Sequence, residues 1–385
     1  MGSYDLAVIG LGAWGSGAAL SGARRFGKGV IGFEQFELGH ARGASEDRSR
    51  IIRYSYHHRD YVALAAHAYA DWARVEQEAG AKLVYKTGGL DFFPPDGPES
   101  LSAYQAAMEA EAVDYEVMKP AQVLDRFPAF FLEEEVITLF QPDGGLVAAD
   151  LATRAMRALA VDGGAELRSG TPVSAVRRLE GGFEVRTGND TVRTQRLVVT
   201  ADAWTNQLLS SLGRHLNLEV TQEQVSYYRA DPAFSAAGFP VWIWMGDPGF
   251  YGLPSLQDSG LKIGQDVGGR RVEADQRSFD PDPAYSRRLH DFMKGLIPSG
   301  WDEAVIEKTC LYTLTPDREF VLDQIPGIPG SAIGLGAAHG FKFAPTAGRI
   351  LVDLACGEDP GIERDRFRAD RPVLTMDNPP TNYLV

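Results

Sequence analysis

Hydrophobic residues near the N-terminus form two short apolar runs that are separated by a glycine-rich turn and an alanine-rich segment. The first run, Leu6-Ala-Val-Ile9, is followed by Gly10, and the second, Val30-Ile-Gly-Phe33, is followed by Glu34. Short apolar runs bounded by turn residues are typical of buried strands, and the segment between these two is long enough for a helix. The pattern predicts a β-α-β unit over residues 1–35.

The periodicity of the remaining chain changes between helical and strand-like. Alanines and aromatic residues at helical spacing, ending before Gly80, alternate with segments in which every second residue is apolar. The predicted elements are a helix over 60–79, a strand over 88–93, helical structure over 97–128, a three-stranded meander built from 166–168, 173–176 and 183–186 with a strand at 197–200, a larger antiparallel sheet over 218–264, and a β-α unit over 331–355.

The first and last predicted units are both of the β-α type, so we expect them to form one discontinuous domain that is interrupted by insertions. The predicted fold class is α/β, with a Rossmann-like dinucleotide-binding domain and an antiparallel-sheet substrate domain. The expected dinucleotide domain comprises residues 1–85, 145–215 and 305–385, and the expected substrate domain comprises 86–144 and 216–304.

The N-terminal glycines have the spacing of a dinucleotide-binding turn. Gly10 allows the tight turn out of the strand, Gly12 removes a side chain where a pyrophosphate approaches backbone N–H groups, and Gly15 lets the helix lie close to the sheet. Glu34, 24 residues after Gly10, can accept hydrogen bonds from both ribose hydroxyls. The alternative is a glycine-rich turn in an ordinary α/β unit, but the flanking strand, helix and acid favour a dinucleotide site.

Composition then excludes several classes of function. The formal net charge of −14 argues against nucleic acid or an anionic membrane as the main partner. No apolar run approaches the roughly 18 residues that cross a bilayer. Cys310 and Cys356 lack metal-ligand spacing and the seven histidines are scattered, so we expect no metal. A reducing cytoplasm is the simplest location for two unpaired cysteines.

Several stretches together resemble the monomeric sarcosine oxidase and N-methyltryptophan oxidase family of flavin amine oxidases. The resemblance covers nearly the whole chain in the same order. It is carried by the N-terminal glycine turn, Ser49-Arg-Ile-Ile-Arg53, Gly260-Leu-Lys262-Ile-Gly264, Cys310-Leu-Tyr312 and His339-Gly-Phe-Lys342-Phe.

The resemblance implies that the dinucleotide is FAD rather than NAD, and that Cys310 is bonded through sulfur to the flavin 8α-methyl carbon. A thiolate is the nucleophile in such an attachment, and Lys308 could help Cys310 to ionise. Without the family context, Cys310 is better interpreted as a small buried hydrophobic residue. The residues that the resemblance assigns to the cofactor are Gly10, Gly12, Ala13, Trp14, Gly15, Glu34, Arg50, Val173, Cys310, Gly340 and Lys342.

The same resemblance assigns catalytic roles to Lys262, Arg50, His339 and Tyr312. Family members carry a lysine at the place of Lys262, beside the flavin, where it promotes the reaction with O2. Arg50 matches a residue that packs against the flavin, and His339 is expected to order a loop at the flavin edge. From the residues alone, Lys262 could equally be an exposed strand lysine, and Arg50 could belong to a solvated charged loop.

Arg53 and Lys342 match the family pair that binds a substrate carboxylate, and such a pair combines a bidentate fork with a point charge. The other expected substrate contacts are Tyr251, Trp242 and Asp266.

The chain departs from the family at several positions. Glu46-Asp-Arg-Ser49 stands where the family has His-Gly-Asp-Thr, Asp202 replaces a glycine, and Asp266 replaces a pocket histidine of the sarcosine enzymes. Asp266 is expected to repel a second carboxylate and to favour a cationic or hydroxylated side chain. These departures make sarcosine itself a doubtful substrate.

The predicted function is oxidation of a secondary amine in an amino acid: hydride transfer to the flavin gives an imine, and O2 is then reduced to H2O2. N-methyl, cyclic and glycated amino acids are all compatible with the sequence, and a monomer is expected. The alternatives are a dehydrogenase with another electron acceptor, a flavin-binding protein without amine turnover, and an NAD-dependent dehydrogenase, which only the N-terminal turn supports.

Overall fold

The N-terminal β-α-β unit lies at the centre of an eight-stranded sheet. The computed structural model describes residues 2–188 and 190–382. Strand β1 (Ser3–Ile9) leads through a turn to helix α1 (Ala13–Phe26), and strand β2 (Val30–Phe33) returns parallel to β1. The predicted unit over residues 1–35 is therefore confirmed.

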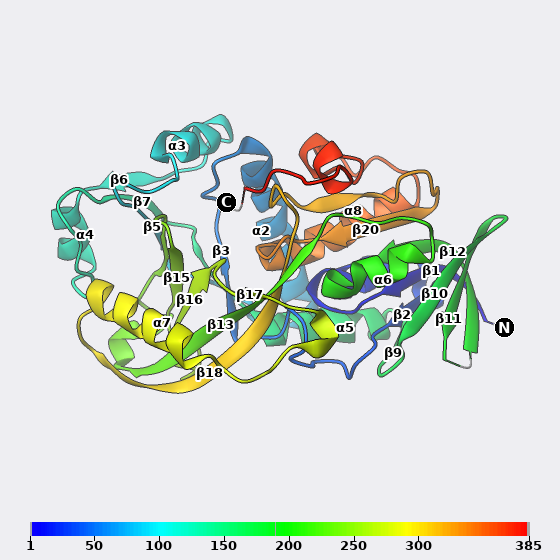
Figure 1. The fold of residues 1–385 in the computed structure, drawn as a ribbon, viewed down its shortest axis with the longest axis horizontal. Helices are drawn as coiled ribbons and strands as arrows, with labels where there is room; N and C mark the ends of the chain where they lie inside the picture. Colours follow the sequence, from blue (N-terminus) through cyan, green and yellow to red (C-terminus); the bar gives the residue numbers. More distant parts are fainter. Residues whose placement is uncertain (1, 189, 383–385) are drawn as a thin grey trace.

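The eight-stranded sheet combines a parallel part with an antiparallel extension (Figure 1). The C-terminal half of β12 (Asp190–Val199) pairs in parallel with β1 and with β20 (Ser331–Leu335), and its N-terminal half continues into a meander. The other strands are β9 (Glu166–Arg168), β10 (Val173–Leu179), β11 (Gly182–Thr187) and β19 (Val321–Gln324). The meander prediction was wrong in one strand: β9 pairs in parallel with β2, and the three meander strands are β10, β11 and β12.

Helix α1 packs between α5 (Ala149–Asp162) and α8 (Ala344–Ala355), and the latter follows β20 as the sequence pattern predicts. The α1–α8 contact depends on two glycines that face each other. A Cβ on Gly348 would lie 2.1 Å from the carbonyl carbon of Gly17, so the two backbones touch where neither helix has a side chain. Helix α2 (Arg59–Ala79) packs on the outer face of α8 and confirms the predicted helix over 60–79.

The second large sheet has nine strands and is covered on one face by α7 (Pro283–Leu296) (Figure 1). Its long strands β13 (Glu219–Ala230) and β18 (Trp301–Leu314) pair over most of their length. The other strands are β5 (Gly89–Phe93), β6 (Glu116–Met118), β7 (Ile137–Gln141), β14 (Val241–Trp244), β15 (Gly249–Leu253), β16 (Leu261–Asp266) and β17 (Arg270–Arg271). The predicted antiparallel sheet over 218–264 is present, with one parallel pairing between β14 and β5.

A three-stranded sheet lies between the two large ones and is formed by β3 (Ser49–Ile52), β8 (Gly145–Ala148) and β4 (Val84–Lys86). The stretch 97–128 is less helical than expected: α3 (Leu101–Ala110) and α4 (Pro120–Arg126) are separated by β6, which pairs with β7. A three-residue strand that depends on its partner for hydrogen bonds leaves little periodicity in the sequence.

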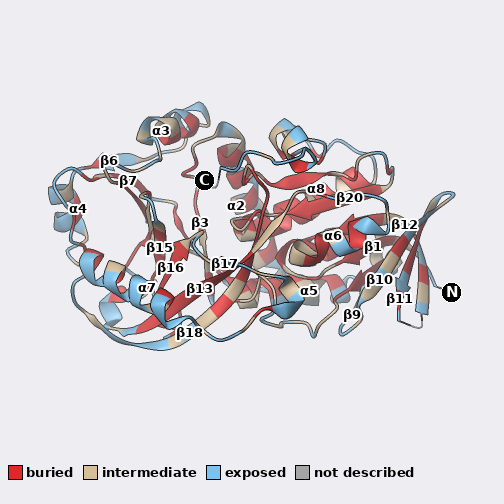
Figure 2. Ribbon diagram, viewed as in Figure 1, coloured by how far each residue is buried: buried red, intermediate tan, exposed pale blue. Residues whose placement is uncertain are grey.

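Buried residues concentrate in the two large sheets and in the helices that cover the N-terminal one (Figure 2). The expected domain boundary at residue 305 falls inside β18, which stays paired with β13 on both sides of it. The division into two domains remains a prediction.

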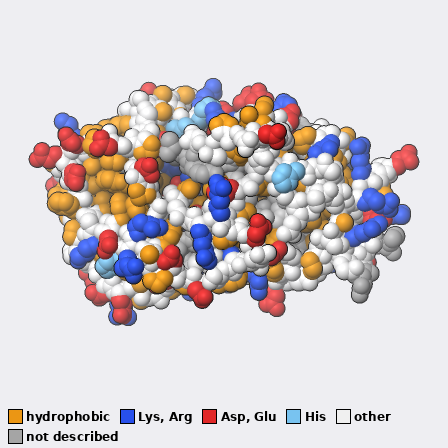
Figure 3. All heavy atoms as spheres, viewed as in Figure 1, with side chains coloured by type: hydrophobic (Ala, Val, Ile, Leu, Met, Phe, Trp, Pro, Cys, Tyr) orange, Lys and Arg blue, Asp and Glu red, His pale blue; other side chains and the backbone are white. Residues whose placement is uncertain are grey.

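Acidic and basic side chains are interspersed on the face shown in Figure 3. Hydrophobic side chains gather at its left side, near α4 and β6, where Phe131, Leu124 and Val117 are exposed. Within residues 2–188 and 190–382, no helix has both the length and the apolar character needed to cross a bilayer.

Replacement of Gly348 by alanine is expected to destabilise the protein, because the added methyl group meets the α1 backbone and pushes two packed helices apart. We expect a loss of about 1–3 kcal/mol in the free energy of unfolding, measured by urea denaturation. Gly295→Ala is the matched control. Gly295 lies exposed in α7 with no atom within 4 Å of its added Cβ, so it should gain about 0.5–1 kcal/mol from the better helix propensity of alanine. Equal effects at the two positions would contradict the close approach of α1 and α8.

Candidate active site

Two adjoining cavities lie beside the glycine turn. The larger, about 630 Å³, is lined by residues of β3, β15, β16 and β18 and by the loop after β20. The smaller, about 380 Å³, lies at the ends of β1 and β2. Residues that line both cavities are Gly12, Ala44, Ser45, Thr200 and Asp202.

The turn at the start of α1 has the geometry that the sequence predicts. Gly10 has a φ of 89°, and a Cβ there would lie 2.4 Å from the carbonyl oxygen of Thr200. A Cβ on Gly15 would lie 1.7 Å from the carbonyl oxygen of Gly10, so the helix can pack at this distance only because residue 15 has no side chain. The first turn of α1 therefore faces the cavities with its backbone close to the surface, as a phosphate site requires.

Glu34 closes the smaller cavity and is fixed by backbone amides. Its carboxylate accepts hydrogen bonds from the N–H groups of Leu11, at 3.0 Å, and Phe36, at 3.2 Å. Burial opposes ionisation, but hydrogen bonds from His40 and from these two amides outweigh it, so the pKa of Glu34 lies below its ordinary value. An ionised acid here suits ribose hydroxyls and disfavours a 2′-phosphate. Val173 also lines this cavity.

Two contacts connect the turn to more distant segments. Ser45 Oγ accepts a hydrogen bond from the N–H of Ala13 at 2.9 Å, at the N-terminus of α1 where an anion would bind. The Trp14 indole donates to the carbonyl oxygen of Gly340 at 2.8 Å. The larger cavity is lined by Gly12, Ala13, Trp14 and Gly340, as the sequence predicts. Ser45 also lines it, although no sequence motif indicated this residue.

The donor set fits FAD. The smaller cavity offers an acid for a ribose and the helix terminus offers N–H groups for a pyrophosphate. Cys310, which is distant from the glycine turn in sequence, lies in the wall of the larger cavity. Asp202, at the junction, has a φ of 46°, in the left-handed region that favours glycine, and burial raises the pKa of its carboxyl to about 6.

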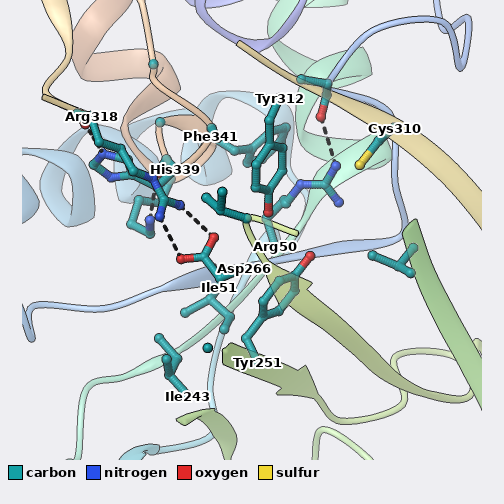
Figure 4. Close-up of a pocket in the computed structure, with 18 of the residues that line it drawn as sticks. Arg50, Ile51, Ile243, Tyr251, Asp266, Cys310, Tyr312, Arg318, His339 and Phe341 are labelled. Carbon is teal, nitrogen blue, oxygen red and sulfur yellow. Dashed lines mark hydrogen bonds and ion pairs between the residues drawn. The ribbon is translucent and has the colours of Figure 1, made fainter. Parts of the chain in front are cut away.

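Cys310 and Tyr312 lie two residues apart on β18 and therefore face the same side of the strand, into the larger cavity (Figure 4). Burial raises the pKa of the Cys310 thiol to about 11, although the nearby Arg50 guanidinium opposes this shift. The positive setting expected for Cys310 is therefore present in Arg50, but it does not overcome desolvation. Lys308, the neighbour proposed from the sequence, instead forms ion pairs with Glu46 and Asp47.

Asp47 is the centre of a buried charged cluster at the cavity wall. Its carboxylate accepts hydrogen bonds from Arg50, from Tyr227 and, at 2.5 Å, from the Lys262 ammonium. Burial opposes ionisation, but Lys262, Arg50 and Lys308 keep the pKa of Asp47 well below its ordinary value. Lys262 is buried, so the alternative of an exposed strand lysine is excluded. Arg50 is likewise held by Asp47 and by the carbonyl oxygen of Ala44 and is not part of a solvated loop.

Arg53 and Lys342 converge on Tyr56. The Arg53 guanidinium lies 4.5 Å from the centre of the tyrosine ring, and the Lys342 ammonium donates to the Tyr56 hydroxyl at 2.8 Å. Lys342 also donates to the carbonyl oxygen of His339, and Arg53 Nη1, which lies 3.8 Å from Asp91, has no hydrogen-bond partner among the described residues. Burial, and then repulsion by Arg53, hold the pKa of Lys342 well below its ordinary value.

Asp266 is already paired. Its two carboxylate oxygens accept hydrogen bonds from the two terminal nitrogens of Arg318, at 2.9 and 2.6 Å (Figure 4). A bidentate partner neutralises this carboxylate. Asp266 lines the larger cavity as expected, but as half of an ion pair, so the expectation that it repels carboxylates and attracts cations needs correction. The sequence analysis did not identify Arg318.

His339 is half-buried and neutral in this setting: desolvation, Lys342 and Arg318 together hold its pKa well below its ordinary value. Its ring contacts the Tyr56 hydroxyl at 3.4 Å and the Arg318 carbonyl oxygen at 3.2 Å, consistent with a role in ordering the loop. Tyr251 lines the larger cavity (Figure 4).

Trp242 does not line this cavity. In β14, Ile243 and Trp244 at the end of the strand line the cavity, whereas the buried Trp242 packs on Phe292 of α7. The assignment of Trp242 to the substrate contacts was therefore wrong. Segments with no motif in the sequence also contribute to the wall: Pro98, Glu99, Thr381 and Asn382.

Comparison with known proteins agrees with this geometry. The family model described as FAD dependent oxidoreductase matches residues 5–354. The chain is 30% identical to a monomeric sarcosine oxidase of Bacillus sp. (strain NS-129), over 91% of this chain and 92% of that protein. It is 27% identical to an N-methyl-L-tryptophan oxidase of Yersinia pestis (strain Pestoides F), over 96% of this chain and 99% of that protein.

Among solved structures, NikD, an unusual amino acid oxidase essential for nikkomycin biosynthesis, is similar with a TM-score of 0.84 and 26% identity, covering 96% of this chain and 98% of that one. The resemblance seen in the sequence is thereby confirmed, as is the α/β flavoprotein fold with antiparallel sheets. The chain belongs to the FAD dependent oxidoreductase family and is a flavin amine oxidase of the sarcosine oxidase-like type.

Proposed function

We propose that the protein oxidises a secondary amine that also carries a carboxylate: an N-methyl, cyclic or glycated amino acid. The observation that carries this proposal is the pair of buried cations, Arg53 and Lys342, at the wall of the larger cavity. Lys342 donates its hydrogen bonds to neutral oxygens, and Arg53 Nη1, 3.8 Å from Asp91, forms no hydrogen bond with a described residue. A substrate carboxylate supplies the missing acceptor and the missing charge.

The two cations also act on the amine. FAD, when bound, accepts a hydride from the carbon next to the substrate nitrogen. Arg53 and Lys342 hold the carboxylate and thereby fix the position of this C–H bond, which lowers the entropic part of the barrier. Their positive charges disfavour an ammonium group nearby, so they favour the neutral amine from which a hydride can leave. His339 stays neutral and adds no competing charge.

We further propose that Lys262 promotes the reduction of O2 to H2O2, and that the cofactor is attached covalently to Cys310. A buried ammonium at the cavity wall stabilises the negative charge that develops on O2 as the first electron arrives. Arg50, which lies 5.9 Å from the Phe341 ring on the same wall, and Tyr312 complete the proposed catalytic set. The proposal describes a monomer in which all of these residues come from one chain.

Covalent attachment can be tested by acid precipitation of the purified protein. The pellet should stay yellow in the wild type and in Cys356→Ala, whereas Cys310→Ala should release the flavin into the supernatant. Because the thiolate is the nucleophile and the pKa of Cys310 is raised to about 11, its thiolate fraction grows about tenfold per pH unit below that value. Attachment of FAD to apoprotein should therefore speed up from pH 7 to pH 9. Free FAD in the wild-type supernatant would contradict this part of the proposal.

The carboxylate site can be tested with an amine substrate and its amidated analogue, with H2O2 release as the measurement. Charge-assisted hydrogen bonds contribute about 1.5–3 kcal/mol each, so Lys342→Met should weaken competitive inhibition by simple carboxylates roughly tenfold to a hundredfold. The amide should be a poor substrate because it leaves Arg53 buried with only the distant Asp91 to compensate its charge. Lys86→Met, which removes an exposed lysine paired with Asp143, is the control and should change neither measurement. Equal turnover of acid and amide would overturn the amino-acid assignment in favour of a plain secondary amine.

A further inference from the structure

A chain of charged side chains leads from the larger cavity toward the outside of the molecule, away from the carboxylate site. Lys262 Nζ lies 2.5 Å from Asp47 Oδ2, and Asp47 Oδ1 lies 2.9 Å from Lys308 Nζ. The exposed fraction of the side chains rises along this Lys262–Asp47–Lys308 chain, from 1% and 2% to 26%. Lys308 is not among the residues that line either cavity, and about a quarter of its side chain is exposed.

The ammonium of Lys262 has a fixed orientation. It donates one hydrogen bond to Asp47 and a second to the carbonyl oxygen of Ser49 at 3.1 Å. An ammonium has three N–H donors, so one proton remains for the cavity that Lys262 lines. The O–H group of Tyr227 donates to Asp47 and holds the carboxylate in place between the two lysines.

Reduction of O2 to H2O2 takes two electrons and two protons. The electrons and one proton come from the reduced cofactor, and the second proton has to come from the protein or the substrate. We propose that Lys262 delivers this second proton and that Asp47 and Lys308 form the route by which it is replaced from solvent. This inference rests on the proposed oxidase function. In each turnover one N–H bond of Lys262 breaks and one O–H bond of H2O2 forms, after which one proton from water restores Lys262 through Lys308 and Asp47.

The charges in the cluster suit such a transfer. Burial lowers the pKa of Lys262 to about 8, with Asp47 opposing the shift and Arg50 and Lys308 adding to it, so the group can lose and regain a proton near neutral pH. Once Lys262 is neutral, Asp47 has lost its nearest cation and becomes a better acceptor for a proton from Lys308. The titratable and charged groups that face Lys262 are Asp47 and Arg50 at β3, Tyr227 on β13, Tyr251 on β15, and Lys308 and Cys310 on β18.

Glu46 anchors the outer end of the chain. Its carboxylate lies 3.1 Å from Lys308 Nζ and is 30% exposed, although it also lines the smaller cavity. Lys308 is thus held between two carboxylates, one buried and one partly exposed. This arrangement orients the lysine toward Asp47 while leaving it in contact with water.

The decisive experiment compares Lys308→Arg with Lys308→Met in the holoenzyme. The flavin is reduced by light with oxalate as the electron donor and no amine present, and its reoxidation by O2 is followed in H2O and D2O from about pH 6 to pH 10. Arginine keeps the positive charge but does not release a proton at these pH values. If Lys308 transfers protons, both variants should reoxidise at least about tenfold more slowly than the wild type. Both should also show a larger solvent isotope effect and be accelerated by added methylammonium.

A purely electrostatic role predicts a different pattern, because Lys308→Arg would then behave like the wild type and only Lys308→Met would shift the pH profile. That result, with an unchanged isotope effect, would overturn the proton route and leave the oxidase function standing. Photoreduced wild-type enzyme that does not react with O2 would overturn both. Lys86→Arg, at the exposed pair with Asp143, is the control and should match the wild type.

A measurement on the resting enzyme tests the position of Asp47 independently of turnover. The visible absorbance of bound flavin responds to a change of charge at Lys262 and should titrate near pH 8 in the wild type. Asp47→Asn removes the negative charge that supports the ammonium, so this titration should move to lower pH. The pH at which reoxidation slows should move with it. An unchanged titration in Asp47→Asn would show that Asp47 does not act on Lys262 and would overturn the proposal.

Discussion

The buried carboxylate of Asp47 is the interaction on which the centre of the molecule depends. It lies just before β3 and binds side chains of β13, β16 and β18, so a single group connects the small central sheet to the nine-stranded one. A carboxylate at this depth is stable only because three cations and a tyrosine hydroxyl compensate for its lost hydration. Removal of one partner from such a buried pair typically costs about 3–5 kcal/mol, so the cluster fixes the geometry of the cavity wall as well as its charge.

The wall of the larger cavity carries two separate groups of paired charges. In the first, the carboxylate of Asp47 offsets part of the positive charge of the cations around it. In the second, Arg318 neutralises the carboxylate of Asp266 with two hydrogen bonds. Arg53 and Lys342 are less completely compensated, because Asp91 lies 3.8 Å from Arg53 and the hydrogen-bond acceptors of Lys342 are neutral. The strongest attraction for an added anion is therefore at this pair, which gives a substrate one preferred orientation.

The family resemblance implies that acids of this wall stand where the family has other residues. By that resemblance, Glu46-Asp-Arg-Ser49 corresponds to a His-Gly-Asp-Thr run, and Asp266 to a histidine. In both places the fold sets cations against a carboxylate: Lys262 and Lys308 against Asp47, and Arg318 against Asp266. These ion pairs allow acids to line the cavity wall without making it negative.

The sequence by itself determined the elements whose signal is local. The turn at Gly10, the acid at Glu34, the helix predicted over 60–79 and the β-α unit predicted over 331–355 follow from apolar periodicity and from glycine geometry within a few residues. The family motifs identified further polar residues as candidates for the site, and nearly all of these residues line the larger cavity.

Only the tertiary structure decided the partners of the charged groups and the faces of the strands. Asp47 and Lys262 are 215 residues apart, and Asp266 and Arg318 are 52 apart, so neither pairing leaves a periodic pattern in the chain. Trp242 and Ile243 are neighbours with similar hydrophobicity, and which of them faces the cavity depends on the register of β14 against β5 and β15. The raised pKa of Cys310 and the lowered pKa of Lys262 likewise come from burial by distant segments, because desolvation depends on what surrounds a group in space and not on its neighbours in sequence.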